Sequence, residues 1–431
     1  MSGTKNQYTQ ENKSFKYWRK RTLFSIMLGY GAYYFVRQNF SCAVPSICRE
    51  LNIDKSDIGW AMSAGAICYG FGKFLFGLIG DRFPARYVLS IGLALSGLMN
   101  ILLGCSSYLS LIVILVALNQ CAQAMGNPPC AKMLANWYKK DEIGGKWGLW
   151  NMAAHIGGAF SVWLSSQLVA NFDWRQVFYV PGMLAITISL FVFNRLRDTP
   201  KSLGFKAIDE LDSSISSIVP TEKLKASEIA KLILTNKLLW LISFAGLFVY
   251  INKMVFFNWG PTMLQEARGS SIVGSGFLMA LFDIAGVFGG LFIGSLSDKY
   301  FNGRRSAVPC ICMFITGLVM SVFKYITSGS TFLIGLCITL LGACMTGPMV
   351  LIGVMATEVS SKKASGSAAG FTGMLGYLGT ALAGVGAGSI ATTYGWNSVM
   401  TVTVVTALCA SLLFGVLWFL QSTNKEKNGK Y

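Results

Sequence analysis

Histidine and charge are both scarce in this sequence, and each shortage narrows the functions open to the chain. A single histidine occurs in 431 residues, and only 13% of the residues are charged. A soluble protein of this length has about twice that charged fraction. Hydrophobic residues make up 53% of the sequence, and the mean hydropathy is +0.52. The composition therefore predicts a polytopic membrane protein whose surface contacts the lipid bilayer.

Patterns typical of metal sites and of enzymes are also missing from the sequence. The 11 cysteines lie mostly within apolar runs, and no pair has zinc-finger spacing. Cys310 and Cys312 are too close together for that pattern. No nucleophile and base stand in a recognisable arrangement. We therefore expect no enzyme activity, no catalytic residues, no metal site and no cofactor.

The positive charge of the chain follows the rule for membrane topology. The net charge of +17 comes from 36 lysines and arginines. If the N-terminus is cytoplasmic, the loops on the opposite side hold few of these cations, namely Arg49, Lys55, Arg175, Arg268 and Lys324. This positive-inside bias predicts that both termini are cytoplasmic. It also means that the charge orients the protein, so we expect no nucleic-acid partner. The first 21 residues have no apolar core, so we expect no removable signal peptide.

Twelve apolar runs are each long enough to cross a bilayer as a helix. The expected spans are 22–48, 57–80, 87–105, 110–138, 144–170, 174–195, 238–266, 272–297, 306–326, 331–359, 364–393 and 396–420. One long polar segment divides them into two groups of six. The sequence therefore predicts an all-α protein with a cytoplasmic N-tail (1–21), a six-helix bundle (22–195), a cytoplasmic linker (196–237), a second six-helix bundle (238–420) and a cytoplasmic C-tail (421–431).

The two halves repeat in register. An Asp-Arg or Asp-Lys pair, followed by a further arginine, comes after the second and the eighth run, and Pro129 and Pro348 recur in the fourth and tenth. Duplicated bundles of this kind are typical of secondary transporters. We expect gating roles for the charged residues in the two repeated loops: Asp81, Arg82, Arg86, Asp298, Lys299 and Arg304.

The stretch 29–40, GYGAYYFVRQNF, places a cation deep within the first span. A guanidinium at the depth of Arg37 is costly in lipid, so it should face the protein interior or a water-filled cavity. Tyr30 and Tyr34 precede it by seven and three residues and therefore share its helix face. A fixed positive charge beside two hydroxyl groups suits an anion such as a phosphate. Arg37 is therefore the first candidate for substrate binding.

The second bundle repeats this arrangement. Lys253 lies in the helix equivalent to that of Arg37, and Tyr250 precedes it by three residues. Cations in equivalent helices of the two halves would face each other where such folds bind their substrates. Asp283, in the eighth span, is the obvious intramembrane carboxylate. It has either a coupling role or a structural role as the partner of Lys253.

Other polar residues within the spans are candidates for the same site. Lys73 has Tyr69 on its helix face, although it lies close enough to the cytoplasmic end to snorkel instead. Asn151 and His155 share a face of the fifth span. His155 is either a hydrogen-bond donor to the anion or the partner of a backbone carbonyl. Tyr377, in the glycine-rich eleventh span, is a further candidate to reach the cavity.

Several motifs along the chain resemble a known family. They are GYGAYYFVRQNF (29–40), GFGKFLFG (70–77), GNPPCAK (126–132), WNMAAHIGG (150–158), RDTPKSLGF (197–205), NWGPTMLQE (258–266), SLSDKYF (295–301) and AAGFTGMLGYLG (368–379). Together they resemble the organophosphate:phosphate antiporters of the major facilitator superfamily, which include the bacterial glycerol-3-phosphate and hexose-6-phosphate carriers.

The resemblance implies a transporter of twelve helices in the bacterial inner membrane, functional as a monomer. It would import a phosphorylated small metabolite in exchange for inorganic phosphate. The positions that match cavity-lining positions of the family are Tyr30, Tyr34, Arg37, Tyr69, Lys73, Tyr250 and Tyr377.

The sequence departs from the family pattern at several positions. Lys253 stands where the family has a second arginine, and His155 comes one residue after the family's histidine. Gln38 and Asn258 replace a lysine and an aspartate, so an ion pair is missing as a unit. Glycerol phosphate, hexose phosphate and phosphoglycerate all remain candidate substrates.

Two other functions remain open on the sequence. One is a proton-coupled organic-anion symporter in which Asp283 or His155 carries the proton. The other is a transporter-like sensor of sugar phosphates, since the resembling family contains such members.

Overall fold

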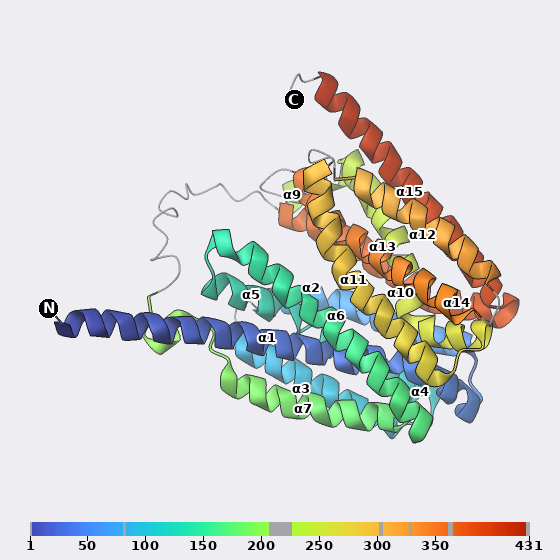
Figure 1. The fold of residues 1–431 in the computed structure, drawn as a ribbon, viewed down its shortest axis with the longest axis horizontal. Coiled ribbons are helices and arrows are strands. Elements are labelled where there is room, and N and C mark those ends of the chain that lie inside the picture. The colour runs from blue at the N-terminus through green and yellow to red at the C-terminus, as the bar shows by residue number, and fades with distance from the viewer. Residues whose placement is uncertain are drawn as a thin grey trace.

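In the part of the chain that the computed structural model describes, twelve long helical units form two groups of six, with α4 and α5 counted as one unit. Figure 1 shows their arrangement. The structure describes residues 2–80, 83–206, 226–300, 305–326, 330–360 and 365–427, and it contains no strand within these ranges. The first group comprises α1 (Ser2–Leu51), α2 (Lys55–Gly80), α3 (Ala85–Gly104), α4 (Leu109–Gln123), α5 (Asn127–Trp137), α6 (Lys140–Asn171) and α7 (Gln176–Arg195).

The second group follows a connecting segment that contains the short helices η1 (Pro200–Leu203) and α9 (Ala226–Leu234). It comprises α10 (Lys237–Arg268), α11 (Ile272–Tyr300), α12 (Ala307–Tyr325), α13 (Thr331–Glu358), α14 (Ser365–Tyr394) and α15 (Trp396–Lys427). Most of the expected linker, residues 207–225, lies outside the described residues. The all-helical prediction is confirmed, and each expected span corresponds to one of these helical units.

Nine spans in the described part of the chain are long and apolar enough to cross a membrane. They are α3, the α4–α5 unit, α7 and all six long helices of the second group. The long helices outside this set interrupt their apolar runs with polar side chains, among them Arg37 in α1, Lys73 in α2 and His155 in α6. Polar residues at membrane depth are tolerated where they face the protein interior.

The segment expected as the N-terminal tail is helical in the structure. Residues 2–21 are the first part of the helix α1, and the turn around Arg19 contacts the end of α5 and the start of α6. Arg19 Nε donates a hydrogen bond to the Trp137 carbonyl at 3.1 Å, and the Arg19 guanidinium pairs with Glu142. Tyr138 donates its hydroxyl to the Arg19 carbonyl at 2.9 Å. These contacts hold the part of α1 around Arg19 against the end of α5.

The two groups meet closely at the end of the molecule opposite the chain termini (Figure 1). Ser63 Oγ in α2 donates to the Ala381 carbonyl in α14 at 2.6 Å. An ion pair of 2.8 Å joins Lys55 of the first group to Glu266 of the second. A Cβ atom on Gly59 would lie only 2.7 Å from the Gly384 carbonyl oxygen, so the two backbones are in contact there. We call this region, formed by α2, α10 and α14, the closed end.

A second ion pair, between Glu50 and Arg175, joins two parts of the first group near the closed end. Glu50 accepts hydrogen bonds from the Arg175 guanidinium at 2.6 Å and from Trp174 Nε1 at 2.6 Å. The Arg175 hydrogen bond holds the pKa of the Glu50 carboxyl below its usual range. Because Glu50 is largely solvated, this pair adds little to stability. Its effect is to fix the loop between α6 and α7 against the end of α1.

Candidate substrate-binding site

Arg37 is held against aromatic rings near the middle of α1. Its guanidinium carbon lies 4.4 Å from the ring centre of Tyr69, 5.7 Å from Tyr34 and 5.8 Å from Phe257. No carboxylate forms an ion pair with Arg37 within the described ranges, and its Nε has no hydrogen-bond partner there. Ring faces attract a guanidinium without neutralising it. The cation therefore keeps its charge and most of its donors for an anion.

Five tyrosines contributed by both groups surround this guanidinium, as the sequence predicts: Tyr30, Tyr34, Tyr69, Tyr250 and Tyr377. We call them the tyrosine cluster. Tyr30 and Tyr34 are 5.5 Å apart between ring centres, and Tyr69 and Tyr377 are 5.0 Å apart. Tyr250 lies 6.1 Å from Tyr377. Because Tyr69 comes from α2 and Tyr377 from α14, the cluster spans the boundary between the two groups.

A second cation, Lys73, lies next to the tyrosine cluster on the side away from the closed end. Lys73 Nζ lies 5.5 Å above the Tyr377 ring, and its side chain is exposed. It therefore lies nearer to the surface than Arg37 does, on the side away from the closed end. Asn151 has no hydrogen bond or ring contact to the tyrosine cluster in the described part of the structure, although its neighbour Trp150 stacks 4.4 Å from Tyr30.

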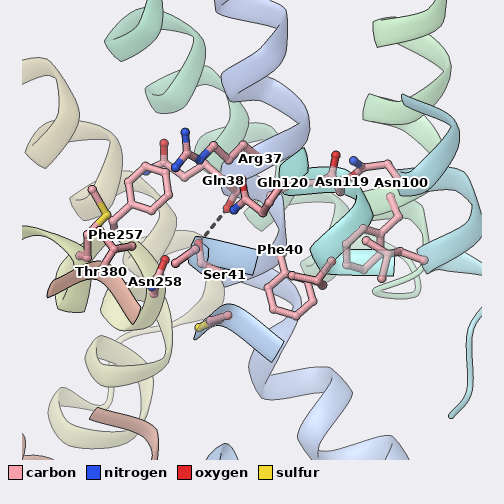
Figure 2. Close-up of a pocket in the computed structure, with 17 residues that line it drawn as sticks. Arg37, Gln38, Phe40, Ser41, Asn100, Asn119, Gln120, Phe257, Asn258 and Thr380 are labelled. Atoms are coloured by element: carbon pink, nitrogen blue, oxygen red, sulfur yellow. Dashed lines mark hydrogen bonds between the residues drawn. The ribbon is translucent and has the colours of Figure 1, made fainter. Parts of the chain in front are cut away.

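A cavity adjoins Arg37 on the side of the closed end (Figure 2). Its polar lining consists of Arg37 and neutral side chains: Gln38, Asn39, Ser41, Asn100, Asn119, Gln120, Asn258 and Thr380. Met62, Phe178, Met254 and Phe257 are among its apolar walls. Neutral amides and hydroxyls can both donate and accept hydrogen bonds. The surroundings of this cavity therefore suit an uncharged hydroxylated group next to an anion held at Arg37.

Lys253 lies behind this cavity and does not line it in this conformation. It is 7% exposed, and its Nζ donates to Thr346 Oγ1 in α13 at 3.0 Å. Asp283, which is 4% exposed, interacts electrostatically with Lys253 and accepts a hydrogen bond of 2.7 Å from Gln38 Nε2. This bond crosses from α1 to α11. Among the described residues, the site thus contains a cation without a carboxylate partner, Arg37, and a cation with a nearby countercharge, Lys253.

His155 belongs to the second of these two surroundings. The Lys253 ammonium interacts electrostatically with its imidazole. No hydrogen bond from His155 to a backbone carbonyl occurs in the described residues. α6 therefore brings His155 within electrostatic range of Lys253.

Sequence reasoning missed the amides that surround α1. Asn39, Asn100, Asn119, Gln120 and Gln123 are polar residues inside apolar runs, and that feature was the available signal. The structure gathers all five beside the segment that carries Arg37. Which amides meet depends on how α1, α3 and α4 pack together, and spacing along one helix does not reveal this.

The repeated loops that were expected to gate the transporter are only partly described. Asp81, Arg82 and Arg304 lie outside the described residues, as do the side chains of Asp298 and Lys299. Arg86 is described, at the start of α3. Its backbone N–H donates to Asp198 Oδ1 at 2.9 Å, and its guanidinium carbon stacks 4.9 Å from Phe193. These contacts tie α3 to the connecting segment and to α7, and Arg86 does not line the cavity.

Comparison with known proteins places this architecture. The family model of the Major Facilitator Superfamily matches residues 26–383 and 290–430. A probable hexose phosphate transport protein of Chlamydia trachomatis serovar D is 36% identical, covering 96% of this chain and 94% of that protein. Membrane sensor protein UhpC of Escherichia coli (strain K12) is 35% identical, covering 93% and 92%. The glycerol-3-phosphate transporter of Bacillus subtilis (strain 168) is 34% identical, covering 94% and 93%.

Solved structures share the fold at low sequence identity. A bacterial homolog to the human lysosomal transporter Spinster, in an inward-facing and unoccupied conformation, superposes with a TM-score of 0.79 at 14% identity, covering 93% of this chain and 97% of that one. The nucleoside transporter NupG superposes with a TM-score of 0.70 at 15% identity, covering 93% and 99%.

Proposed function

Because the chain belongs to the Major Facilitator Superfamily, a family of transporters rather than enzymes, we propose that it imports a phosphorylated small metabolite in exchange for inorganic phosphate. Glycerol-3-phosphate and hexose-6-phosphate are the candidate substrates, since relatives at 34–36% identity are named as transporters of glycerol-3-phosphate and of hexose phosphate. The observation that carries the proposal is the state of Arg37. It is a membrane-embedded guanidinium without a carboxylate partner in the described residues, beside a polar cavity at the boundary of the two groups.

The proposal assigns the phosphoryl group to Arg37. A guanidinium fork binds phosphate oxygens through parallel charge-assisted hydrogen bonds. The tyrosine cluster supplies hydroxyl donors around the same point. The organic part of the substrate would then contact the neutral amides and hydroxyls of the adjoining cavity. Lys73 and Asn151 lie nearer the open side, where they would meet the organophosphate as it leaves the site and inorganic phosphate as it enters.

The proposal also gives Lys253 a place in the mechanism. A phosphate dianion at Arg37 would draw the Lys253 ammonium away from Thr346, so that cations of both groups close on one anion. The bound anion would cancel the repulsion between these cations and lower the barrier to rocking of the two groups. A carrier without substrate would reorient slowly, which favours exchange over net flux.

The positive-inside bias suggests that the termini are cytoplasmic, and the closed end would then face the outside. On this proposal the protein works as a monomer in the bacterial inner membrane, and the phosphate gradient drives uptake.

Exchange is tested with purified protein in proteoliposomes. Vesicles loaded with inorganic phosphate should take up labelled glycerol-3-phosphate or hexose-6-phosphate at least about tenfold faster than vesicles without internal phosphate, because reorientation of the empty carrier limits the rate. Protein-free vesicles are the control. Equal uptake with and without internal phosphate would contradict exchange.

Two outcomes of that experiment favour the other functions. Uptake driven by a pH gradient without internal phosphate, and lost in Asp283→Asn, would indicate a proton-coupled symporter. Binding of sugar phosphate without uptake under any gradient would indicate a sensor. This outcome is included because UhpC, a relative at 35% identity, is named a membrane sensor protein.

Replacement of Lys253 tests whether that residue binds the anion. We expect Lys253→Ala to raise the KM for phosphate by about tenfold or more, since a charge-assisted hydrogen bond contributes about 1.5–3 kcal/mol. Lys253→Arg should keep most of the affinity. The loss could instead come from the Asp283 charge left without a counterion. The double variant Lys253→Ala, Asp283→Asn separates these causes, because full recovery of phosphate affinity would show that Lys253 serves only to balance Asp283.

A further inference from the structure

α1 is interrupted at the residue before Arg37. Val36 has φ −100° and ψ 16°, which are not helical values, although the helix continues on both sides. This region of backbone space is sparsely populated and recurs at functional sites. A break in a long helix needs a cause, such as a proline or a side chain that enters the hydrogen-bond ladder. The proline of this helix, Pro45, lies more than two turns away.

The cause is visible at the carbonyl of Val36. It accepts a hydrogen bond from Asn100 Nδ2 in α3 at 2.9 Å and another from Asn119 Nδ2 in α4 at 3.1 Å. A carbonyl oxygen has two lone pairs, and side-chain amides use both of them here. The neighbouring carbonyl of Phe35 accepts Ser161 Oγ from α6 at 2.8 Å. Three helices therefore hold the backbone of α1 at the break.

The two asparagines are themselves fixed in orientation. Asn119 Oδ1 accepts Ser96 Oγ at 2.5 Å, and Asn100 Oδ1 accepts Asn39 Nδ2 at 2.7 Å. Asn100 is fully buried and Asn119 is 7% exposed. Each amide therefore presents its nitrogen to Val36 because its oxygen is already engaged. Both atoms of each asparagine amide that faces Val36 are therefore engaged, and such buried hydrogen bonds restrict the amide to one orientation.

We propose that Asn100 and Asn119 are positioning residues for Arg37, which aim its guanidinium by maintaining the break at Val36. Without these donors the Val36 carbonyl would return to the helical ladder. A change of one residue in helical phase turns a side chain by about 100°. Within the described residues Arg37 has no ion-pair partner, and its guanidinium lies against the rings of Tyr34, Tyr69 and Phe257, so the backbone that carries it contributes to its direction. The inference rests on the proposed role of Arg37 in phosphate binding.

Both asparagines also line the cavity, so a direct contact with the organic part of a substrate is the competing explanation. The two roles differ in which ligands they affect. If Arg37 is misdirected, the affinity falls for every ligand that carries a phosphoryl group, including inorganic phosphate. If instead a contact to the organic part is lost, the affinity for the organophosphate falls and the affinity for inorganic phosphate does not change.

The experiment measures Kd for inorganic phosphate and for glycerol-3-phosphate and hexose-6-phosphate on the purified full-length protein, together with the Tm without ligand. The variants are Asn100→Leu, Asn119→Leu and the milder Ser161→Ala. The matched control is Ser243→Ala, since Ser243 is equally buried and donates to the Leu239 carbonyl within its own helix at 2.7 Å. Both asparagine variants should raise the Kd for inorganic phosphate and for the organophosphates by the same factor, about tenfold. The reason is that a small misplacement of a binding group lowers affinity strongly.

Ser161→Ala should raise the Kd for the same ligands by about threefold, because it removes one neutral hydrogen bond, the one to the Phe35 carbonyl next to the break. It carries the test if the asparagine variants do not fold. Ser243→Ala should leave every Kd within about twofold. A lowered Tm with unchanged phosphate affinity would overturn the proposal, and so would a loss confined to the organophosphate. Arg37→Ala is measured alongside: if it binds phosphate as the wild type does, the proposed function fails as well, whereas if it alone loses phosphate, only the positioning role fails.

Discussion

Arg37→Lys is expected to abolish organophosphate uptake in phosphate-loaded vesicles while the protein still reaches the membrane. Lysine keeps the positive charge but replaces a planar fork with a point charge. Two or more charge-assisted hydrogen bonds to the phosphoryl oxygens change, each contributing about 1.5–3 kcal/mol, so a fall of roughly a hundredfold in uptake follows. The lysine ammonium would also lose the stacking of the guanidinium on the Tyr69 ring.

Arg175→Lys is the control for this substitution. Arg175 precedes α7 and forms a partly exposed ion pair with Glu50 of α1, outside the tyrosine cluster and the closed end. Exposed pairs of this kind contribute about 0–1 kcal/mol, so uptake should stay within about twofold of the wild type. Both variants are compared at equal amounts of membrane-inserted protein. Normal uptake by Arg37→Lys would remove this residue from the substrate site.

Gly59→Leu is expected to stop exchange by holding the closed end apart. A Cβ atom at this position would lie 2.7 Å from the Gly384 carbonyl oxygen and 3.0 Å from Val385 Cα. Both neighbours are backbone atoms of a long helix and cannot move aside as a side chain does. The structure described here then becomes inaccessible, and alternation between two states stops. Exchange should fall to near the protein-free background, while phosphate binding stays within about threefold because Arg37 is not touched.

Gly386→Leu is the matched control, since it lies on the same helix two residues from Gly384 and a Cβ there meets nothing within 4 Å among the described residues. We expect it to exchange phosphate at close to the wild-type rate. If Gly59→Leu also exchanges normally, the contact between α2 and α14 does not form during transport, and the alternating-access proposal loses its closed state.

Much of the architecture was accessible from the sequence because it depends on local properties. The length and hydropathy of each run predict a membrane helix, and the polar segment after residue 195 separates the two groups. Arg37 was predictable because a cation at membrane depth must have a protein or aqueous neighbour. Tyr30 and Tyr34 were predictable because helical spacing places them on its face. The family profile confirms the fold that these features indicate.

Contacts between helices could not be read from the sequence, because each depends on the packing of elements far apart in the chain. The sequence placed Lys253 opposite Arg37, whereas the structure seats it on Thr346 beside Asp283. In the sequence, Gln38 was notable only because it stands where the resembling family has a lysine. In the structure it donates a hydrogen bond to Asp283, across the boundary between the two groups. The sequence by itself determined which helices cross the membrane and which cation lies among them, since composition and periodicity act within one helix. Only the tertiary structure decided how that cation is aimed, because the donors that break α1 at Val36 come from α3 and α4.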